Sequence, residues 1–417
     1  MTSTTKHGIL RQFGRATAIA LAWALSLAAT ILPARAQTFK SLYSFTGGND
    51  GMFPNGPLAL DVGGNLYGVA TYSQNGRGYG TVFKLSPAGK LTVLHSFGGG
   101  NDGDGANGTS GVIRDAVGNL YGTTWGGGLN NQGVVFKVSK TGKESVLYRF
   151  TGGNDGEEPA AGLVRDDAGN LYGTTGASGL CVGCGTVFKL SSTGKETVLR
   201  RFKGPPDAAH VLTGNQVLDA KGNLYGVSYF GGLTSGCFVP QQGCGTFFEL
   251  SPNGKGGWSE KVLYKFKGGK DGAYPNSGLL SDGKGGFYGT TEWGGNSGCG
   301  GSGCGTLFKF DSAGKETVLY RFTGGKDGAA PGQQLVLDAE GNLYGTATEG
   351  GSDTCPDGGC GTAFKLDTSG KLTVMHAFGG TDGAYPGALL RDAVGNLHGA
   401  TFQGGASSWG TIFEITP

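Results

Sequence analysis

The chain has 417 residues, of which 87 are glycine and only 15% are charged. Collagen is excluded because there is no Gly-X-Y period, and disorder because apolar residues recur in order at low charge. The first 36 residues contain four basic and no acidic side chains, so without them the formal charge of +2 becomes 2 − 4 = −2. A nearly neutral chain lacks the positive charge that nucleic-acid binding requires, so we expect no nucleic-acid partner.

The N-terminal segment has the pattern of a secretory signal peptide. Lys6, Arg11 and Arg15 precede an apolar run at 16–32, and small residues Ala34 and Ala36 follow it. We predict a signal peptide at 1–36 with cleavage after Ala36, and therefore export to the periplasm or out of the cell. The alternative is a membrane anchor, but the run is just short of a comfortable span. No second run of spanning length follows, so we expect no membrane insertion after cleavage.

Three phrases recur through the rest of the chain. The first, GNLYG in its commonest form, recurs at spacings of 51 to 63 residues. It starts at Gly64, Gly118, Gly169, Gly222, Gly285, Gly341 and Gly395. The second, GTVFKL, and the third, TVLYRF, also occur once in each of the seven repeats. A period of this length predicts a tandem array of one supersecondary unit.

Each repeat contains four short segments rich in Val, Leu, Phe, Tyr and Thr, without helical periodicity, so we predict four strands. Asp-x-x-Gly-Asn separates the first two strands, and Ser/Asp-x-x-Gly-Lys separates the last two. Both are tight-turn signals, which makes the unit an antiparallel meander. Seven such units predict an all-β fold, a seven-bladed β-propeller of four-stranded antiparallel blades. A β-helix would repeat at about half this length or less.

The ends of the repeat region predict how the ring closes. Segment 39–45 matches the fourth strand of a unit, and segment 410–415 matches the third. We expect the N-terminal strand to complete the last blade, because this pairing removes an exposed sheet edge. The predicted domain spans 37–417, with blades at 57–97, 110–150, 161–202, 212–266, 277–322, 333–378, and 387–417 completed by 38–46.

The connections from strand two to strand three, and from blade to blade, are long and share one face, which we call the looped face. All eight cysteines lie there as four local pairs: Cys181/Cys184, Cys237/Cys244, Cys299/Cys304 and Cys355/Cys360. Their even number and the exported context predict four loop disulfides, each stabilising by roughly 2 kcal/mol. Zinc binding or CxxC redox chemistry is the alternative at Cys181 and Cys184, but the other spacings suit zinc less well.

The phrases GNLYGTT, GTVFKLS and GKETVLYRF, with GGxDGxxP between units, resemble the Gloeo/Verruco tandem repeat of exported "choice-of-anchor" bacterial proteins. The Asp-x-x-Gly-Asn-Leu-Tyr turn is also similar to that of NHL-type propeller blades. The resemblance covers 37–417 and implies export and a repeat architecture. It implies no reaction, and it carries over no catalytic residues.

Two sets of residues on the looped face are candidate ligand-binding groups. The first set is the acid of each GGxDG link: Asp50, Asp102, Asp155, Asp271, Asp327 and Asp382. The alternative for these acids is a local Asx-turn. One Asp per loop is too few for calcium unless carbonyl oxygens complete the shell, and the five His residues are scattered. We therefore expect no metal site and no cofactor.

The second set consists of aromatic residues that follow the LYG phrase in five repeats: Tyr72, Trp125, Tyr229 with Phe230, Trp293 and Phe402. Flat rings at the looped face suit stacking on a sugar or a peptide. The alternative is that they pack beneath the glycine-rich loops.

No catalytic constellation is visible, so the pattern favours a monomeric binding or scaffolding module with a carbohydrate or peptide ligand. Two alternatives stay open: a polysaccharide hydrolase or lyase with a site at the central funnel, and a structural envelope protein without a ligand. A funnel lined by convergent acids, Arg or His with shifted pKa values would indicate the enzyme. A funnel lined by Gly, Thr and aromatic residues would indicate binding.

Overall fold

The computed structural model describes residues 37–417 except 101–102, 109, 179–182, 212–214, 240, 353 and 356–357. The predicted signal peptide lies outside the described residues. The chain divides into Met1–Gln37 and Thr38–Pro417, and the second unit contains all of the described strands. Within its described part, no helix has the length and apolarity needed to cross a bilayer.

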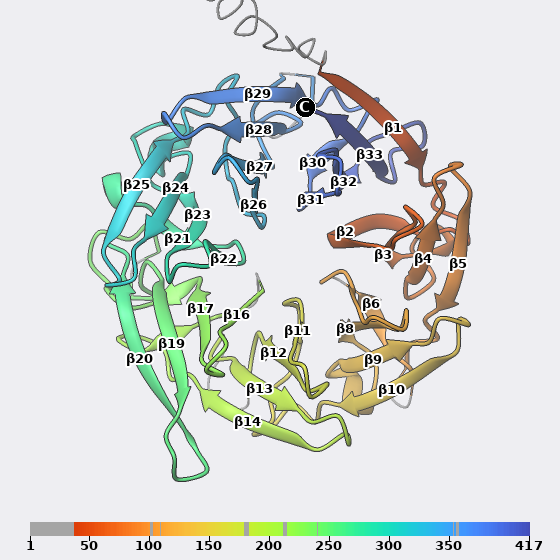
Figure 1. Cartoon of the computed structure of the whole chain (residues 1–417), viewed down its shortest axis with the longest axis horizontal. Coiled ribbons are helices and arrows are strands. Elements are labelled where there is room, and N and C mark those ends of the chain that lie inside the picture. The colour runs from red at the N-terminus through yellow and green to blue at the C-terminus, as the bar shows by residue number, and fades with distance from the viewer. Residues whose placement is uncertain are drawn as a thin grey trace, which may run out of the picture. The chain divides into compact units, whose positions relative to one another are not determined.

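Seven antiparallel sheets surround a common axis, each with its first strand innermost and its fourth outermost (Figure 1). Sheet one contains β2 (Met52–Leu60), β3 (Leu66–Tyr72), β4 (Thr81–Leu85) and β5 (Leu91–Ser96). Sheet two contains β6 (Ala106–Gly108), β7 (Ile113–Arg114), β8 (Leu120–Gly126), β9 (Val134–Val138) and β10 (Glu144–Arg149). Sheet three contains β11 (Val164–Arg165), β12 (Leu171–Thr175), β13 (Thr186–Leu190) and β14 (Glu196–Arg201).

Sheet four contains β16 (Val217–Leu218), β17 (Leu224–Ser228), β19 (Thr246–Pro252) and β20 (Trp258–Lys265). Sheet five contains β21 (Ala273–Pro275), β22 (Leu280–Ser281), β23 (Phe287–Trp293), β24 (Thr306–Phe310) and β25 (Glu316–Arg321). Sheet six contains β26 (Val336–Leu337), β27 (Leu343–Ala347), β28 (Thr362–Leu366) and β29 (Leu372–Ala377). A ribbon of β15 (Ala208–Ala209) and β18 (Phe230–Gly231) accompanies sheet four.

The seventh sheet contains both ends of the domain. Its strands are β30 (Ala384–Pro386), β31 (Leu390–Arg391), β32 (Leu397–Gln403), β33 (Thr411–Thr416) and β1 (Thr38–Ser44). Strand β1 pairs antiparallel with β33, from Thr38 opposite Thr416 to Ser44 opposite Thr411. The predicted all-β fold, the seven blades and the closure of the ring by the N-terminal strand are therefore confirmed.

The glycine of the LYG phrase makes room for the phenylalanine of the GTVFKL phrase. A Cβ on Gly289 would lie 2.5 Å from Cζ of Phe308, and the glycine of each other blade has the same relation to its own phenylalanine. Such a contact is far below van der Waals separation, so a side chain at this position would displace the ring. Two of the recurring phrases thus describe the two sides of one contact.

A second recurring contact joins each blade to the next. The phenylalanine that ends the TVLYRF phrase packs against the GTVFKL phenylalanine of the following blade, as Phe150 does against Phe188 with ring centroids 5.2 Å apart. The pair that closes the ring, Phe45 and Phe83, has the same arrangement at 5.3 Å. These rings are buried, so the hydrophobic core lies between adjacent blades.

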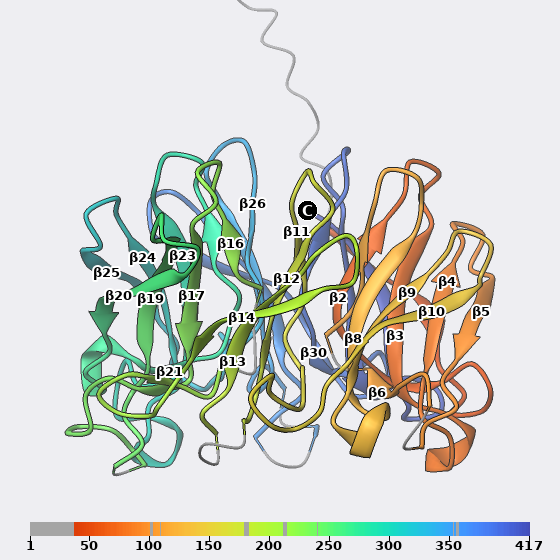
Figure 2. The same cartoon turned by 90° about the horizontal axis from the view of Figure 1, so that it is seen from below.

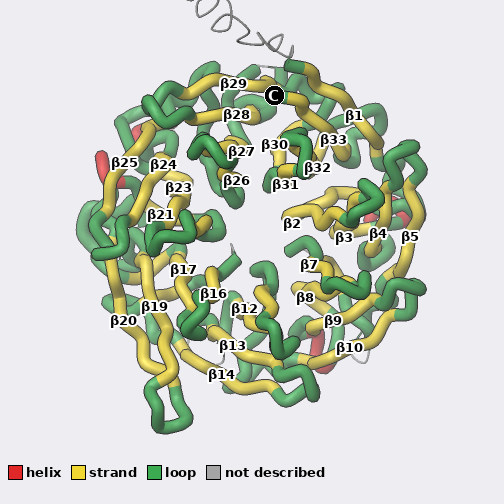
Figure 3. The backbone as a smooth tube through the Cα atoms, in the orientation of Figure 1, coloured by secondary structure: helices red, strands yellow, loops and turns green. Residues whose placement is uncertain are grey.

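The two faces of the ring differ as predicted. The tight turns lie on one face, where Asp61 Oδ1 accepts the N–H groups of Gly63 and Asn65 at 2.9 Å each. The Tyr67 hydroxyl donates to Asp61 Oδ2 at 2.9 Å, so the tyrosine of GNLYG also stabilises its turn. The looped face carries the short helices η1 (Gln74–Gly76), η2 (Leu129–Asn131), η3 (Gly269–Asp271) and η4 (Cys299–Gly301) (Figures 2 and 3).

Candidate functional site

The seven innermost strands surround a cavity of about 260 Å³ on the axis of the ring. Every blade contributes to its lining, and the polar side chains there come from Asn55, Ser110, Asn215, Asn276, Gln333 and Gln334. The inner strands bend at this level. In the first blade, for example, pairing between β2 and β3 is interrupted between Asn55 and Ala59. The bend turns backbone and short side chains toward the axis.

Glycines at these bends let neighbouring blades meet closely. A Cβ on Gly111 would lie 2.3 Å from the carbonyl oxygen of Pro57, and one on Gly162 would lie 1.8 Å from Oδ1 of Asn215. The Asn215 side chain also reaches past the fifth blade, where its Nδ2 donates to Oε1 of Gln334 at 3.1 Å. An amide bridge between blades four and six thus forms part of the cavity wall.

The lining combines apolar surface with uncharged polar side chains. Among the described residues that line the cavity, none is Asp, Glu, Lys, Arg or His. Asn and Gln supply both hydrogen-bond donors and acceptors, and Trp125 supplies a flat apolar surface. Such a lining can bind hydroxyl or amide groups through hydrogen bonds, whereas its described residues include no acid–base pair.

Two carboxyl groups contact side chains that line the cavity: Glu158 is hydrogen-bonded to the Trp125 side chain, and Glu292 to Asn276. Asn276, which lines the cavity, donates from Nδ2 to Oε2 of Glu292 at 3.0 Å. Burial raises the pKa of Glu292, while its hydrogen bonds with Tyr229 and Asn276 act in the opposite direction. Glu292 therefore helps to position the Asn276 amide.

A ring of seven residues with left-handed backbone surrounds the axis on the looped face. Each blade contributes one, in the segment that precedes the bend: Phe53, Asn107, Glu158, His210, Tyr274, Ala330 and Tyr385, all with φ between 53° and 58°. We call this set the left-handed ring. Non-glycine residues rarely adopt this conformation, so tertiary contacts must hold it in place.

Those contacts are hydrogen bonds to the preceding blade. Phe53 N–H donates to the Trp409 carbonyl at 2.9 Å, and Tyr274 N–H donates to the Cys244 carbonyl at 2.9 Å. In six blades the acceptor is the carbonyl of the residue before the glycine of the GTVFKL phrase in the preceding blade. In the fourth blade, the N–H of His210 donates instead to the carbonyl of Gly183 at 2.6 Å. The left-handed ring therefore joins successive blades at the looped face.

The predicted aromatic residues lie next to the left-handed ring. Phe402 stacks on Phe53 with centroids 4.9 Å apart, and Tyr72 meets Phe53 edge-on at 6.2 Å. On the far side of the ring, Tyr229 stacks on Tyr274 at 5.1 Å, and Phe230 meets the same ring at 5.6 Å. These four residues are brought into two separate clusters.

The two tryptophans of the set differ in their surroundings. Trp293 stacks at 6.5 Å on Phe238, which is 68% exposed. Trp125 is 40% exposed and is the one predicted aromatic residue that lines the axial cavity in the described structure. The left-handed ring and the amide lining were not predicted from the sequence. In the sequence, the position of the left-handed ring corresponds to the variable residue before the proline of GGxDGxxP. The position of the amide lining corresponds to the variable residues after this proline.

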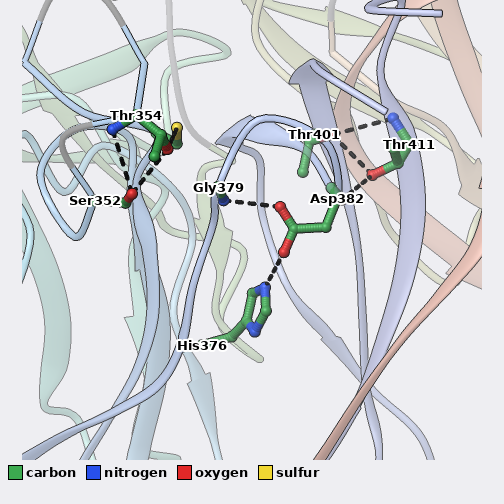
Figure 4. A network of polar contacts seen from close by, with 8 residues as sticks. Ser352, Thr354, His376, Gly379, Asp382, Thr401 and Thr411 are labelled. Carbon is green, nitrogen blue, oxygen red and sulfur yellow. Dashed lines mark hydrogen bonds and ion pairs between the residues drawn. The ribbon is translucent and has the colours of Figure 1, made fainter. Parts of the chain in front are cut away.

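The acids of the GGxDG links lie at the outer edge of the looped face, apart from the cavity. Asp50 accepts from Thr46 N–H at 2.8 Å and from the Tyr43 hydroxyl at 2.9 Å. Asp382 accepts from Gly379 N–H at 2.8 Å and contacts Nε2 of His376 at 2.7 Å (Figure 4).

The other link acids make the same kind of local contact. Asp155 and Asp327 each accept from a threonine N–H at 2.9 Å, and Asp271 accepts from Lys267 N–H at 2.8 Å. Asp102 lies outside the described residues. Ligand binding by these acids stays a prediction.

Three of the four predicted disulfides are present: Cys237–Cys244, Cys299–Cys304 and Cys355–Cys360. Cys184 is also disulfide-bonded, whereas its predicted partner Cys181 lies outside the described residues. In the three described pairs, the carbonyl of the second cysteine accepts the hydrogen bond from the left-handed ring of the next blade, at 2.9–3.0 Å. Each of these disulfides therefore lies in a loop between the second and third strands of one blade, at the point where that loop is hydrogen-bonded to the next blade.

Comparison with known proteins gives one family and a shared fold. The family model described as the Gloeobacter/Verrucomicrobia repeat matches residues 29–180, 102–300 and 239–417. Among curated protein sequences, none matches this chain significantly.

Many solved structures are similar to this chain in fold, among them two surface or extracellular proteins. The extracellular domain of the hybrid two-component system BT3049 from B. thetaiotaomicron is 15% identical, with a TM-score of 0.55 over 91% of this chain and 41% of that one. PorZ, a surface component of the type-IX secretion system of Porphyromonas gingivalis, is 15% identical, with a TM-score of 0.51 over 89% of this chain and 47% of that one. The chain thus spans less than half of either structure.

Proposed function

Because the chain belongs to the Gloeobacter/Verrucomicrobia repeat family, we propose that it is an exported binding module that takes a carbohydrate or peptide at its looped face. The signal-peptide pattern at 1–36 supports export. The loop disulfides support it as well, since such bonds persist in oxidising compartments.

The observation that carries the proposal is the axial cavity with its uncharged amide lining and Trp125. Asn and Gln side chains can donate to and accept from the hydroxyl groups of a sugar, and an indole ring can cover its apolar face. The aromatic clusters around Phe53 and Tyr274 extend this surface outward. Together these features favour a neutral carbohydrate within the proposed ligand classes.

The lining favours binding over polysaccharide hydrolysis. Most glycoside hydrolases place two carboxyl groups about 5 to 10 Å apart on either side of the scissile bond. The described cavity lining carries amides and no carboxyl group, and the nearby Glu292 and Glu158 are hydrogen-bonded to the lining residues Asn276 and Trp125.

A glycan array probed with the protein and with Trp125→Ala tests the proposal. We expect neutral oligosaccharides to bind and the variant to lose at least about tenfold in affinity, as for a central aromatic contact. Trp293→Ala tests the outer aromatic cluster, and Trp258→Ala, which alters an aromatic residue beside a tight turn, is the matched control. Absence of binding to every glycan and peptide would refute the proposal.

A further inference from the structure

The outer edge of the ring repeats one three-residue arrangement at every junction between blades. The first residue lies on the fourth strand of one blade, two positions before the phenylalanine that ends its TVLYRF phrase. The second is the acid of the link that follows. The third lies on the fourth strand of the next blade, six positions before the phenylalanine that ends the TVLYRF phrase of that blade. In order from the closing junction, these are Tyr43/Asp50/Leu91, His95/Asp104/Glu144, Tyr148/Asp155/Glu196, Arg200/Asp207/Glu260, Tyr264/Asp271/Glu316, Tyr320/Asp327/Leu372 and His376/Asp382/Phe39. We call each set an outer junction.

The outer junction between blades one and two has a composition found at no other. His95 Nε2 lies 2.6 Å from Oδ2 of Asp104, and one oxygen of Glu144 lies within 4.8 Å of both ligand atoms. Gly98 N–H donates to the other Asp104 oxygen at 2.7 Å, which fixes the orientation of the carboxylate. Oε1 of Glu144 is buried and has no hydrogen-bond partner among the described residues.

From this geometry we propose that His95, Asp104 and Glu144 form a binding site for a divalent transition-metal ion such as Zn²⁺. The three side chains come from β5, the link after it and β10, so the ion would join blades one and two. Three protein ligands leave a fourth position for water, as in many tetrahedral zinc sites.

Charge and donor type support a transition metal. The cluster brings two carboxyl groups and one imidazole within 4.8 Å of one another, and a divalent cation held between them would offset the repulsion between the two carboxylates. An imidazole nitrogen suits zinc, copper or nickel, whereas calcium and magnesium prefer oxygen ligands.

The other outer junctions show what the site lacks elsewhere. At the three other junctions with Glu, the first position holds Tyr or Arg in place of His. The tyrosines donate to the link Asp, whereas Arg200 binds both Asp207 at 2.7 Å and Glu260 at 2.6 Å. A buried Glu Oε1 without a hydrogen-bond partner among the described residues occurs at all four Glu junctions, so the imidazole is what distinguishes this one. His376 does contact Asp382 (Figure 4). Phe39, however, occupies the third position and stacks on the imidazole at 3.8 Å. The repeat therefore supplies natural replacements for the His and Glu ligands of the site.

Calorimetric titration of the tag-free, metal-stripped protein with Zn²⁺ tests the proposal. We expect one ion per chain, and at least tenfold weaker binding for His95→Tyr and Glu144→Leu. His95→Tyr recreates the composition of two other junctions, and Glu144→Leu introduces the residue that Leu91 and Leu372 supply at the same position, so both variants should fold, which circular dichroism would verify. His376→Tyr is the matched control and should bind as the unaltered protein does.

Thermal unfolding provides a second readout that does not depend on heats of binding. Zn²⁺ should raise the melting temperature of the unaltered protein and of His376→Tyr, but not of the two site variants, because only folded chains hold the ion. Equal zinc binding by all four proteins, no binding at millimolar zinc, or calcium binding as tight as zinc binding would each overturn the proposal.

Discussion

At the scale of single residues, the recurring phrases encode contacts of two kinds. The Asp of the Asp-x-x-Gly-Asn turn was predictable, because Asp61 does what its sequence context requires. The LYG glycine was not predictable in the same way. Its need for space depends on a phenylalanine in the next strand, and the sequence does not show that Gly289 faces Phe308.

Gly289→Ala should lower the free energy of unfolding by about 1 to 3 kcal/mol, because the new methyl group would lie 2.5 Å from Phe308 Cζ in a packed core. Urea denaturation gives the value. Gly325→Ala is the control, since its Cβ would meet its nearest neighbour at 3.8 Å. Equal stabilities of the two variants would show that the glycine serves another purpose.

A further residue-scale prediction concerns pH. Burial, together with Asp271, raises the pKa of Glu316 to about 7, while Arg321 and Lys267 oppose the shift. The folded chain thus binds this proton more tightly than the unfolded chain, whose glutamate titrates near 4.5. The contribution of Glu316 to stability is therefore full below about 4.5 and is lost as pH rises through about 7.

Urea denaturation at pH 5 and pH 8 tests this sign. From pH 5 to pH 8, the free energy of unfolding should fall less for Glu316→Gln than for the unaltered protein. Glu340→Gln, which alters an exposed turn, should show the same fall as the unaltered protein. If the free energy of unfolding of Glu316→Gln changed between pH 5 and pH 8 as much as that of the unaltered protein, Glu316 would not be the source of the pH dependence.

At the scale of elements, strand positions and ring closure followed from the repeat, because the two ends of the domain supply complementary parts of one unit. The inner strands were only partly predicted. In four blades the inner strand begins before the expected start of the blade, as β2 does at Met52, and then bends at the axis. The bend depends on left-handed residues such as Tyr274, whose conformation is set by a carbonyl of the preceding blade.

Ring closure makes an element-scale prediction that has an internal standard. Phe45 in the closing junction and Phe150 in an ordinary one are both fully buried against an equivalent phenylalanine. Phe45→Ala and Phe150→Ala should therefore each lower the free energy of unfolding by about 3 to 5 kcal/mol. If Phe45→Ala cost less than about 1 kcal/mol, the N-terminal strand would not be a full member of the last blade.

At the scale of the whole molecule, the candidate sites combine residues that the sequence keeps apart. The looped face was predictable from loop length, but the axial cavity combines a short, variable stretch from each of the seven blades with Trp125 from β8. The His95, Asp104 and Glu144 cluster likewise spans two blades, so neither spacing nor the scattered His residues indicated it. Side chains that converge through closure of the ring become visible only in three dimensions.

The most direct test of ligand binding at the axial cavity is calorimetric titration of the strongest glycan from the array. We predict binding by the unaltered protein and by Trp258→Ala, and at least about tenfold weaker binding by Trp125→Ala. Equal affinity of Trp125→Ala and the unaltered protein for that glycan would contradict the account.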